Sequence, residues 1–433
     1  MSEKNNDKQF FSVGKIFFLL VVIPLSLMAI LIANGIFKVG DMARQGAVTV
    51  LDQKAQEEIK TRAISVAEEV ASFLKEREKD VLVATIIPPT EGAYRDFMAK
   101  NVGALWVKKD GQIVRVFEPL YTEMAFIDNS GNETIRISGG KVVPRANLGN
   151  VSNPAGTTYK SEDYFTKAKA LARGEVHVSH PAGWYVNKQD FAKGKRFEGV
   201  IRFATPVFDK SGASGVVELA LDMRHLMKFT DNIIPTQSGY VLEADAATGN
   251  YAFMVDNRGL IISHPNDFHI AGLNADGTPV VPLTAENQAA LTKKGEEVLD
   301  LNQLAFMDPN LPAIAKDAAA GNAGMKQYKF AGHEKFVAYA PIKYFASSYP
   351  KPAGFGWIGM GVDVGKFNVF ATEAAKKIQS ETKAWTTTIV IIIIVSVVLL
   401  FLIMALLTRG ISRSIASEVP AGSESIVFDD DDD

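Results

Sequence analysis

Two aspartates and one histidine-containing string are the side chains whose types and spacing could do chemistry. Asp222 and Asp363 stand at the same place in two similar strings, GVVELALDM and GWIGMGVDV. Two such carboxylates could act as general acid and base, contact a ligand, or mark one fold element that is used twice. The string HPNDFH brings together His264, Asp267 and His269, and imidazole and carboxylate groups are ligands that zinc accepts.

The rest of the sequence offers no catalytic set to which these residues could belong. It contains no H-E-x-x-H string, no G-x-S-x-G elbow and no phosphate-binding G-x-x-x-x-G-K-[ST] loop. The absence of cysteine excludes disulfides, thiolate nucleophiles and cysteine-based metal sites. We therefore expect that the protein is not an enzyme and has no catalytic residue. The net charge of −3, without a Lys/Arg-rich patch, indicates no nucleic-acid partner.

Two uncharged apolar runs, residues 16–37 and 385–408, predict transmembrane helices. At ~1.5 Å per residue, each is long enough to cross a hydrocarbon core of ~30 Å. A cleaved signal peptide is the alternative interpretation of the first run. Its apolar core is long for a signal peptide, and no small-x-small cleavage site follows, so we expect an uncleaved anchor.

Basic residues beyond the outer ends of both runs predict the orientation of the chain in the membrane. These residues are Lys4, Lys8, Lys15, Arg409 and Arg413. We expect residues 1–15 and 409–433 to lie in the cytoplasm. Residues 38–384 would then lie outside, in the periplasm of a bacterium with two membranes, and the protein would be a multi-pass protein of the inner membrane.

The region after the first span begins with a predicted long helix, residues 41–87. Its sequence has no proline and one glycine, and its apolar residues recur in steps of three and four, which is the pattern of one buried stripe. The helix is expected to end at Pro88 and Pro89. The stripe could pack on the protein's own core, pair with a second protomer, or do both.

Short strands and turns follow this helix, and their pattern occurs twice. Residues 123–138 and 200–223 each read as strand, turn and strand, and residues 161–174 read as a helix that is capped by serine and ends at glycine. AFIDNSG is echoed by AFMVDNRG, RFATPV by AYAPIK, and GVVELALDM by GWIGMGVDV, in the same order. We therefore predict an α+β fold with a first module, residues 88–232, and a second module, residues 233–384.

This arrangement resembles the double Cache sensor domain of bacterial transmembrane receptors, such as methyl-accepting chemotaxis proteins. The strings that carry the resemblance are SEDYFTKAKA, GEVHVSHP and IRFATPVFDKSGASGVVELALDM in the first module, and GYVLEAD, YAFMVDNRGLIISHPND and GWIGMGVDV in the second. The resemblance implies two tandem PAS-like modules with antiparallel sheets, the first distal to the membrane and the second proximal. It also implies that HPNDFH is a turn at a strand end, so we expect no metal and no cofactor.

In such receptors, small molecules generally bind in the distal module, under a helix and a loop that cover its sheet. The cover would be residues 159–168 and 178–187. An Arg-x-Trp-Tyr string clamps amino acids in one subgroup, but Glu162 stands at the position of its arginine, which argues against standard amino-acid recognition. Cations, neutral metabolites and acids held elsewhere remain open. The candidate ligand-binding residues are Tyr164, His180, Trp184, Tyr185, Arg202 and Asp222.

The resemblance implies a homodimeric transmembrane receptor that passes a signal to a cytoplasmic output module or partner. The string GISRSI, at the start of the short tail 409–433, is similar to the opening of a HAMP linker, but the following residues do not continue the pattern. The alternative is a stand-alone, membrane-anchored protein for ligand binding or assembly that acts through a partner. Asp363, unlike Asp222, is predicted to cap a turn at a strand end.

Overall fold

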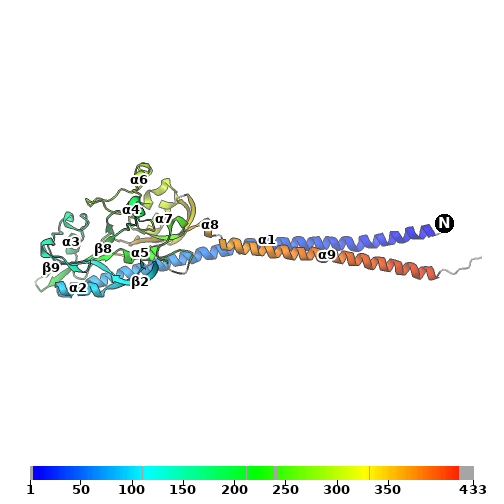
Figure 1. Ribbon diagram of the computed structural model, residues 1–433, viewed down its shortest axis with the longest axis horizontal. Coiled ribbons are helices and arrows are strands. Elements are labelled where there is room, and N and C mark those ends of the chain that lie inside the picture. The colour runs from blue at the N-terminus through cyan, green and yellow to red at the C-terminus, as the bar shows by residue number, and fades with distance from the viewer. Residues whose placement is uncertain are drawn as a thin grey trace, which may run out of the picture. The chain divides into compact units, whose positions relative to one another are not determined.

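The computed structural model describes residues 3–109, 111–210, 212–237, 239, 241–330, 332–367 and 369–418 (Figure 1). It divides the chain into two compact units. The first, here called the helical unit, comprises residues 1–52 and 369–433. The second, called the sheet unit, comprises residues 53–368. The end of the predicted cytoplasmic tail, from residue 419, lies outside the described residues.

The helical unit contains two long apolar helices. Helix α1 is Glu3–Ala84, which continues into the sheet unit, and α9 is Val369–Glu418. Each contains an apolar stretch long enough to cross a membrane, with mean hydropathy of 2.5 in α1 and 3.6 in α9. The predicted spans therefore lie in these two helices. The long helix predicted over residues 41–87 lies in α1, which is continuous from Glu3 and ends at Ala84.

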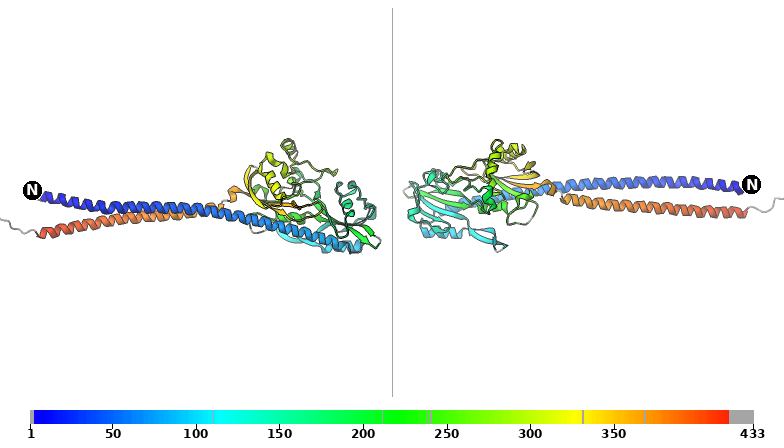
Figure 2. Two further views of the ribbon diagram at one scale, coloured as in Figure 1. Left: turned by 180° about the vertical axis from the view of Figure 1, so that it is seen from behind. Right: turned by 45° about the horizontal axis from the view of Figure 1, so that its top comes forward.

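The part of α1 in the sheet unit is held by one apolar stripe. Its buried residues recur at helical spacing and join a single core with strands of both modules: Ile59, Ala63, Val66, Ala67, Val70, Leu74, Val81 and Ala84. Figure 2 shows this part of α1, in light blue, running alongside the strands. Packing within the protein's own core, one of the two roles predicted for the stripe, is confirmed.

The first module is built on a seven-stranded sheet in the order β5-β4-β3-β9-β8-β6, with β7 also paired to β8. Its strands are β3 (Tyr121–Asp128), β4 (Glu133–Ser138), β5 (Lys141–Val142), β6 (His177–Val178), β7 (Ala182–Gly183), β8 (Gly199–Asp209) and β9 (Gly212–Asp222). A separate hairpin joins β1 (Val102–Lys109) to β2 (Gln112–Pro119). The helices are α2 (Glu91–Lys100), α3 (Tyr164–Lys169), α4 (Lys188–Ala192) and α5 (Arg224–Asp231).

The second module has a five-stranded antiparallel sheet in the order β11-β10-β14-β13-β12. Its strands are β10 (Tyr251–Asp256), β11 (Ile261–Ser263), β12 (Gly324–Phe330), β13 (His333–Ile342) and β14 (Gly356–Asp363), and its helices are α6 (Gln288–Lys294), α7 (Asn310–Ala319) and α8 (Val364–Phe367). Short 3-10 helices are η1 (Arg145–Asn147), η2 (Pro154–Gly156), η3 (Ala246–Thr248), η4 (Asp267–His269) and η5 (Leu301–Phe306). Two sheets in one chain confirm the α+β prediction.

The helix predicted over residues 161–174 is shorter than expected. Helix α3 covers Tyr164–Lys169, and Asp163 rather than Ser161 stands at its N-cap. The Ser161 hydroxyl lies two residues before this N-cap and donates to the Tyr159 carbonyl, 3.2 Å away. The segment before α3 therefore folds as a tight loop that brings Glu162 toward the sheet.

The aspartates Asp222 and Asp363 occupy equivalent turns in the two modules. Asp222 ends β9, where its Oδ1 accepts a hydrogen bond from the backbone N–H of Arg224 at 2.9 Å. Asp363 ends β14, where its Oδ1 accepts one from the N–H of Gly365, also at 2.9 Å. The cap predicted for Asp363 is confirmed, and the matching turns agree with one element that is used twice.

The buried stripe of α1 should dominate the stability of the sheet unit. Leu74 has 0% of its surface exposed, so Leu74→Ala should leave a cavity and lower the free energy of unfolding by about 2–5 kcal/mol. The control is Val83→Ala on the same helix, where the side chain is 49% exposed and the expected change is below about 0.5 kcal/mol. Urea unfolding of the detergent-solubilised chain measures both, and equal losses would contradict this role of the stripe.

Candidate ligand site

A group of charged side chains lies on the face of the first sheet that α3 covers. The cross-strand register places Arg202 of β8 opposite Ala220 of β9, and Ala220 opposite Glu123 of β3. Glu218 lies two residues before Ala220, so it projects from the same face. The alanines at neighbouring positions leave room for the long charged side chains, which would otherwise collide with the cover.

Arg202 is the centre of this group, and only 1% of its surface is exposed. Its Nε donates to Glu162 Oε1 at 2.7 Å, and its Nη1 donates to Glu218 Oε1 at 2.8 Å and to Glu123 Oε2. The guanidinium carbon also lies 5.0 Å from the centre of the Tyr164 ring. A buried guanidinium is tolerated only when it is paired in this way. We call these residues, together with Arg136 and Glu133, the acidic cluster.

Arg136 of β4 extends the cluster toward the edge of the sheet. Its Nη2 donates to Glu123 Oε1 and, at 2.9 Å, to Thr158 Oγ1, and its Nη1 lies 3.5 Å from Glu133 Oε1. Its Nε is buried without a hydrogen-bond partner among the described residues. A buried donor without an acceptor costs free energy.

The cluster contains four carboxylates and two guanidiniums, and the pKa values of two of its carboxyl groups shift in opposite directions. Burial raises the pKa of Glu218 to about 7, because Arg202 compensates only part of the desolvation and Glu123 adds repulsion. Burial opposes ionisation of Glu123 too, but Arg202 and Arg136 together lower its pKa to about 2. At neutral pH, Glu218 is therefore the member that gains or loses a proton.

The structure brings only part of the predicted site together. Tyr164 and Arg202 meet in the cluster, and the ring of Trp184 packs against Tyr159 at the cluster's edge, with 5.2 Å between the ring centres. Asp222 is buried next to β8, but its Oδ2 accepts two hydrogen bonds from the guanidinium of Arg224. Whether these residues contact a ligand stays a prediction.

The side chains of His180, Trp184 and Tyr185, predicted to form an aromatic wall, contact different parts of the sheet unit. His180 Nε2 lies 3.0 Å from Asn257 Oδ1, in the second module. The Tyr185 hydroxyl donates to the carbonyl of Phe268 at 2.9 Å and accepts from the N–H of Glu297, also in the second module. These two side chains join the modules, whereas Trp184 packs against a tyrosine of the first module. Whether they contact a ligand stays a prediction.

Reasoning from sequence missed most of the acidic cluster. Glu123 and Glu218 are acidic residues inside largely apolar strings, YTEMAFID and GVVELALDM. A continuous apolar run predicts a strand that is buried on both faces, and a carboxylate inside such a strand requires a partner, which is the available signal. Nothing in the local sequence indicates that the partner is Arg202.

The side chains of HPNDFH point to separate partners. Asp267 Oδ2 accepts from the N–H of Phe197 at 2.6 Å, whereas His264 Nδ1 accepts from Asn266 and His269 Nδ1 faces the carbonyl of Glu297. In the described part of the chain, no group of three histidine, aspartate or glutamate side chains has the geometry of a metal site.

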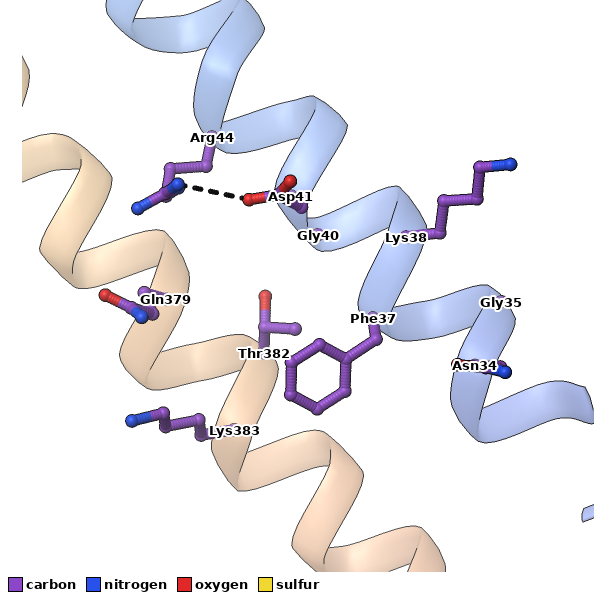
Figure 3. Close-up of a pocket in the computed structure, with 10 residues that line it drawn as sticks. All are labelled: Asn34, Gly35, Phe37, Lys38, Gly40, Asp41, Arg44, Gln379, Thr382 and Lys383. Atoms are coloured by element: carbon purple, nitrogen blue, oxygen red, sulfur yellow. Dashed lines mark ion pairs between the residues drawn. The ribbon is translucent and has the colours of Figure 1, made fainter. Parts of the chain in front are cut away.

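The helical unit contains a hollow of about 640 Å³ between α1 and α9 (Figure 3). Phe37 and Thr382 line it, and Arg44 pairs with Asp41 at 3.2 Å on its rim. It lies beside Gly40, where a Cβ would come within 2.5 Å of Thr382, so the two helices approach closely there. The hollow is lined by residues of these two helices alone.

Residues 44–362, most of the chain, match the Cache domain family of the double type, dCache_1. The chain belongs to the Cache domain family. Among curated proteins no sequence matches it. The match covers both modules, so the resemblance inferred from the repeated strings is confirmed.

Several solved structures are similar to this Cache domain. A domain of a sensory box/GGDEF family protein from Vibrio parahaemolyticus is 12% identical, covers 74% of this chain and 99% of its own, and gives a TM-score of 0.43. The ligand-binding domain of the Pseudomonas aeruginosa amino-acid chemoreceptor PctC, in complex with GABA, is 14% identical, covers 69% of this chain and 95% of its own, and gives a TM-score of 0.37. The ligand-binding domain of the Pseudomonas fluorescens chemoreceptor CtaA, in complex with L-leucine, is 15% identical, covers 76% of this chain and 99% of its own, and gives a TM-score of 0.36.

The raised pKa of Glu218 should make stability depend on pH. The ordinary value is 4.5, so the folded state holds the proton more tightly than the unfolded state, and stability is lost as pH rises from about 4.5 through about 7. We expect the free energy of unfolding to fall by about 1–3 kcal/mol between about pH 5 and about pH 8.

Glu218→Gln should flatten this profile, because glutamine stays neutral at every pH. Exposed Glu198→Gln is the matched control and should keep the wild-type slope. Urea unfolding at several pH values measures all three proteins. A Glu218→Gln profile as steep as that of the wild type would show that another group carries the pH dependence.

Proposed function

We propose that this Cache protein is a transmembrane sensor that binds a small cationic molecule at the acidic cluster and transmits the binding event across the membrane. The proposal is supported above all by one observation, the buried cluster of four carboxylates and two guanidiniums under the cover of the first sheet. Membership of the Cache family, whose modules are sensor domains, is its second support.

The charge balance of the cluster favours a cation. Both arginines are already paired with carboxylates, so a ligand carboxylate would have to displace an internal one. An amine, by contrast, could replace the proton of Glu218 and offset the excess of negative charge. The Tyr164 and Trp184 rings near the cluster supply faces that attract a cation.

In the proposed mechanism, Glu162 links ligand binding to a movement of the cover over the first sheet. It lies on the loop before α3, whereas Arg202 lies on the sheet, so their contact fastens the cover to the sheet. A cation that competes for the carboxylates weakens this contact and shifts the population toward a state in which the cover is displaced. The protein acts by binding, not by catalysis.

The rest of the proposal concerns the membrane. The two apolar helices would anchor the chain in the inner membrane, with the sheet unit in the periplasm and the termini in the cytoplasm. Two copies would pair into a homodimer, and a cytoplasmic output module or partner would receive the signal. Connectivity supports this route, because α1 enters the sheet unit directly and β14 leads through α8 into α9.

Amines should stabilise the protein through the first module, and carboxylic acids should not stabilise it through that module. Thermal unfolding of the full chain in detergent, with putrescine, choline, glycine, acetate or succinate, tests the ligand class. Amine affinity should rise with pH up to about pH 7, by at most about tenfold per pH unit, because binding displaces the Glu218 proton. This rise should be absent in Glu218→Gln. Stabilisation by carboxylates alone, through the first module, would overturn the proposal of a cationic ligand.

Glu162→Gln should loosen the cover without removing the side chain. Loss of the charge weakens the contact with Arg202, which we expect to cost about 1–3 kcal/mol and to speed hydrogen exchange of the α3 amides. Asp163→Asn changes the exposed neighbouring carboxylate and is the matched control. Hydrogen exchange with mass spectrometry reads out both, and equal α3 exchange in the two variants would argue against the role of Glu162.

A further inference from the structure

The second module contains a buried lysine that the site in the first module does not use. Lys335 lies on β13, opposite Asp363 of β14 and Tyr328 of β12. Only 2% of its surface is exposed. Lysine is rarely buried to this extent unless its ammonium is paired.

The surroundings of the Lys335 ammonium are aromatic. Its Nζ lies 3.9 Å from the centre of the Tyr251 ring and 5.8 Å from that of Phe330. In the described part of the chain, the ammonium has no hydrogen-bond or ion-pair partner. Ring faces offset only part of the cost of burying the charge, so an anion beside the ammonium would stabilise it.

Lys335 is one wall of a cleft of about 180 Å³. The other residues that line it are Asp308, Asn310, Gln327, Tyr328, Lys329, Glu334 and Val364. This volume is below the ~300–1,000 Å³ of sites for drug-sized ligands, and it suits a molecule of a few heavy atoms.

We propose that this cleft is a second ligand site, which binds a small monocarboxylate or dicarboxylate through the ammonium of Lys335. A carboxylate supplies a charge that complements the ammonium, and an apolar chain on it can rest against the Tyr328 ring, which lines the cleft. Of the two lysines in the lining, Lys329 is paired with Glu334, and the one buried ammonium suits a carboxylate better than an inorganic phosphate, which is bound by several converging donors.

The two acidic side chains that line the cleft, Asp308 and Glu334, have other partners. Asp308 Oδ1 accepts from the N–H of Asn310 at 2.7 Å, and its Oδ2 accepts from the N–H of Lys329 at 2.8 Å. Glu334 lies 3.7 Å from the Lys329 ammonium, and both side chains are exposed. The Asp363 Oδ2 lies 2.8 Å from His333 Nδ1.

Binding at this site should depend on pH. Burial lowers the pKa of Lys335 to about 7, against the opposing effect of Asp363. A bound carboxylate favours the protonated amine, so its affinity should fall as pH rises above about 7. The charged or titratable groups that face Lys335 are Asp363 and His333, the rim residues Asp308, Lys329 and Glu334, and the buried His264 and His269, whose pKa values burial lowers.

Lys335→Met tests the proposal, because methionine keeps the length of the side chain and removes its charge. Removing an unpaired buried charge should leave the fold intact or stabilise it, so loss of binding cannot come from unfolding. Lys329→Met on the rim of the same cleft is the matched control. The full chain in detergent is titrated calorimetrically with acetate, propionate, succinate and inorganic phosphate, at about pH 6 and about pH 8.

We expect at least one carboxylate to bind the wild type and Lys329→Met more tightly at the lower pH, and Lys335→Met to lose about tenfold or more in affinity. Glu218→Gln should bind it as the wild type does, which separates this site from the one in the first module. The proposal is overturned if none of the carboxylates binds, if phosphate alone binds, or if Lys335→Met binds as tightly as Lys329→Met.

Discussion

The burial of one stripe of α1 against two sheets is the constraint on which the sheet unit depends. Apolar residues from Ile59 to Ala84 share one core with strands of both modules, so neither sheet can leave the helix without exposing that core. Hydrogen bonds also join α1 to the modules. Arg62 donates to backbone carbonyls of the segment that joins the modules, and Glu78 accepts from the hydroxyl of Tyr344 at 2.8 Å. The shared core and these contacts join both modules to α1.

Arg202 imposes a second constraint, within the first module. A guanidinium out of contact with water must be neutralised, and removing one partner of such a pair typically costs about 3–5 kcal/mol. The carboxylates that neutralise it also repel one another, which is why the pKa of Glu218 rises to about 7 while that of Glu123 falls to about 2. The cluster is thus held together by charge and is sensitive to any added charge, which is the property that a sensor requires.

The two modules share a scaffold and differ in the chemistry of their covered faces. The turn made by Asp222 recurs at Asp363, in strands with equivalent positions in the two sheets. The first sheet directs carboxylates and arginines at its cover, whereas the second directs tyrosines and Lys335 at its own. Sheets with equivalent strands therefore carry different buried charges on their covered faces. The repeated aspartate turn indicates duplication of a module and not a catalytic pair.

The sequence by itself determined the features that depend on local pattern. These are the two apolar spans, the helical stripe, the strand pairs around turns such as Asn129 to Asn132, and the repeated strand-end aspartate. The apolar strings around Glu123 and Glu218 also indicate that both are buried, but only the tertiary structure decided that both pair with Arg202, which also pairs with Glu162. The reason is physical: side-chain direction follows from neighbouring residues, whereas partners follow from strand register and from a loop that closes over distant parts of the chain. For the same reason, the isolation of Lys335 is visible only once β12, β13 and β14 are placed side by side.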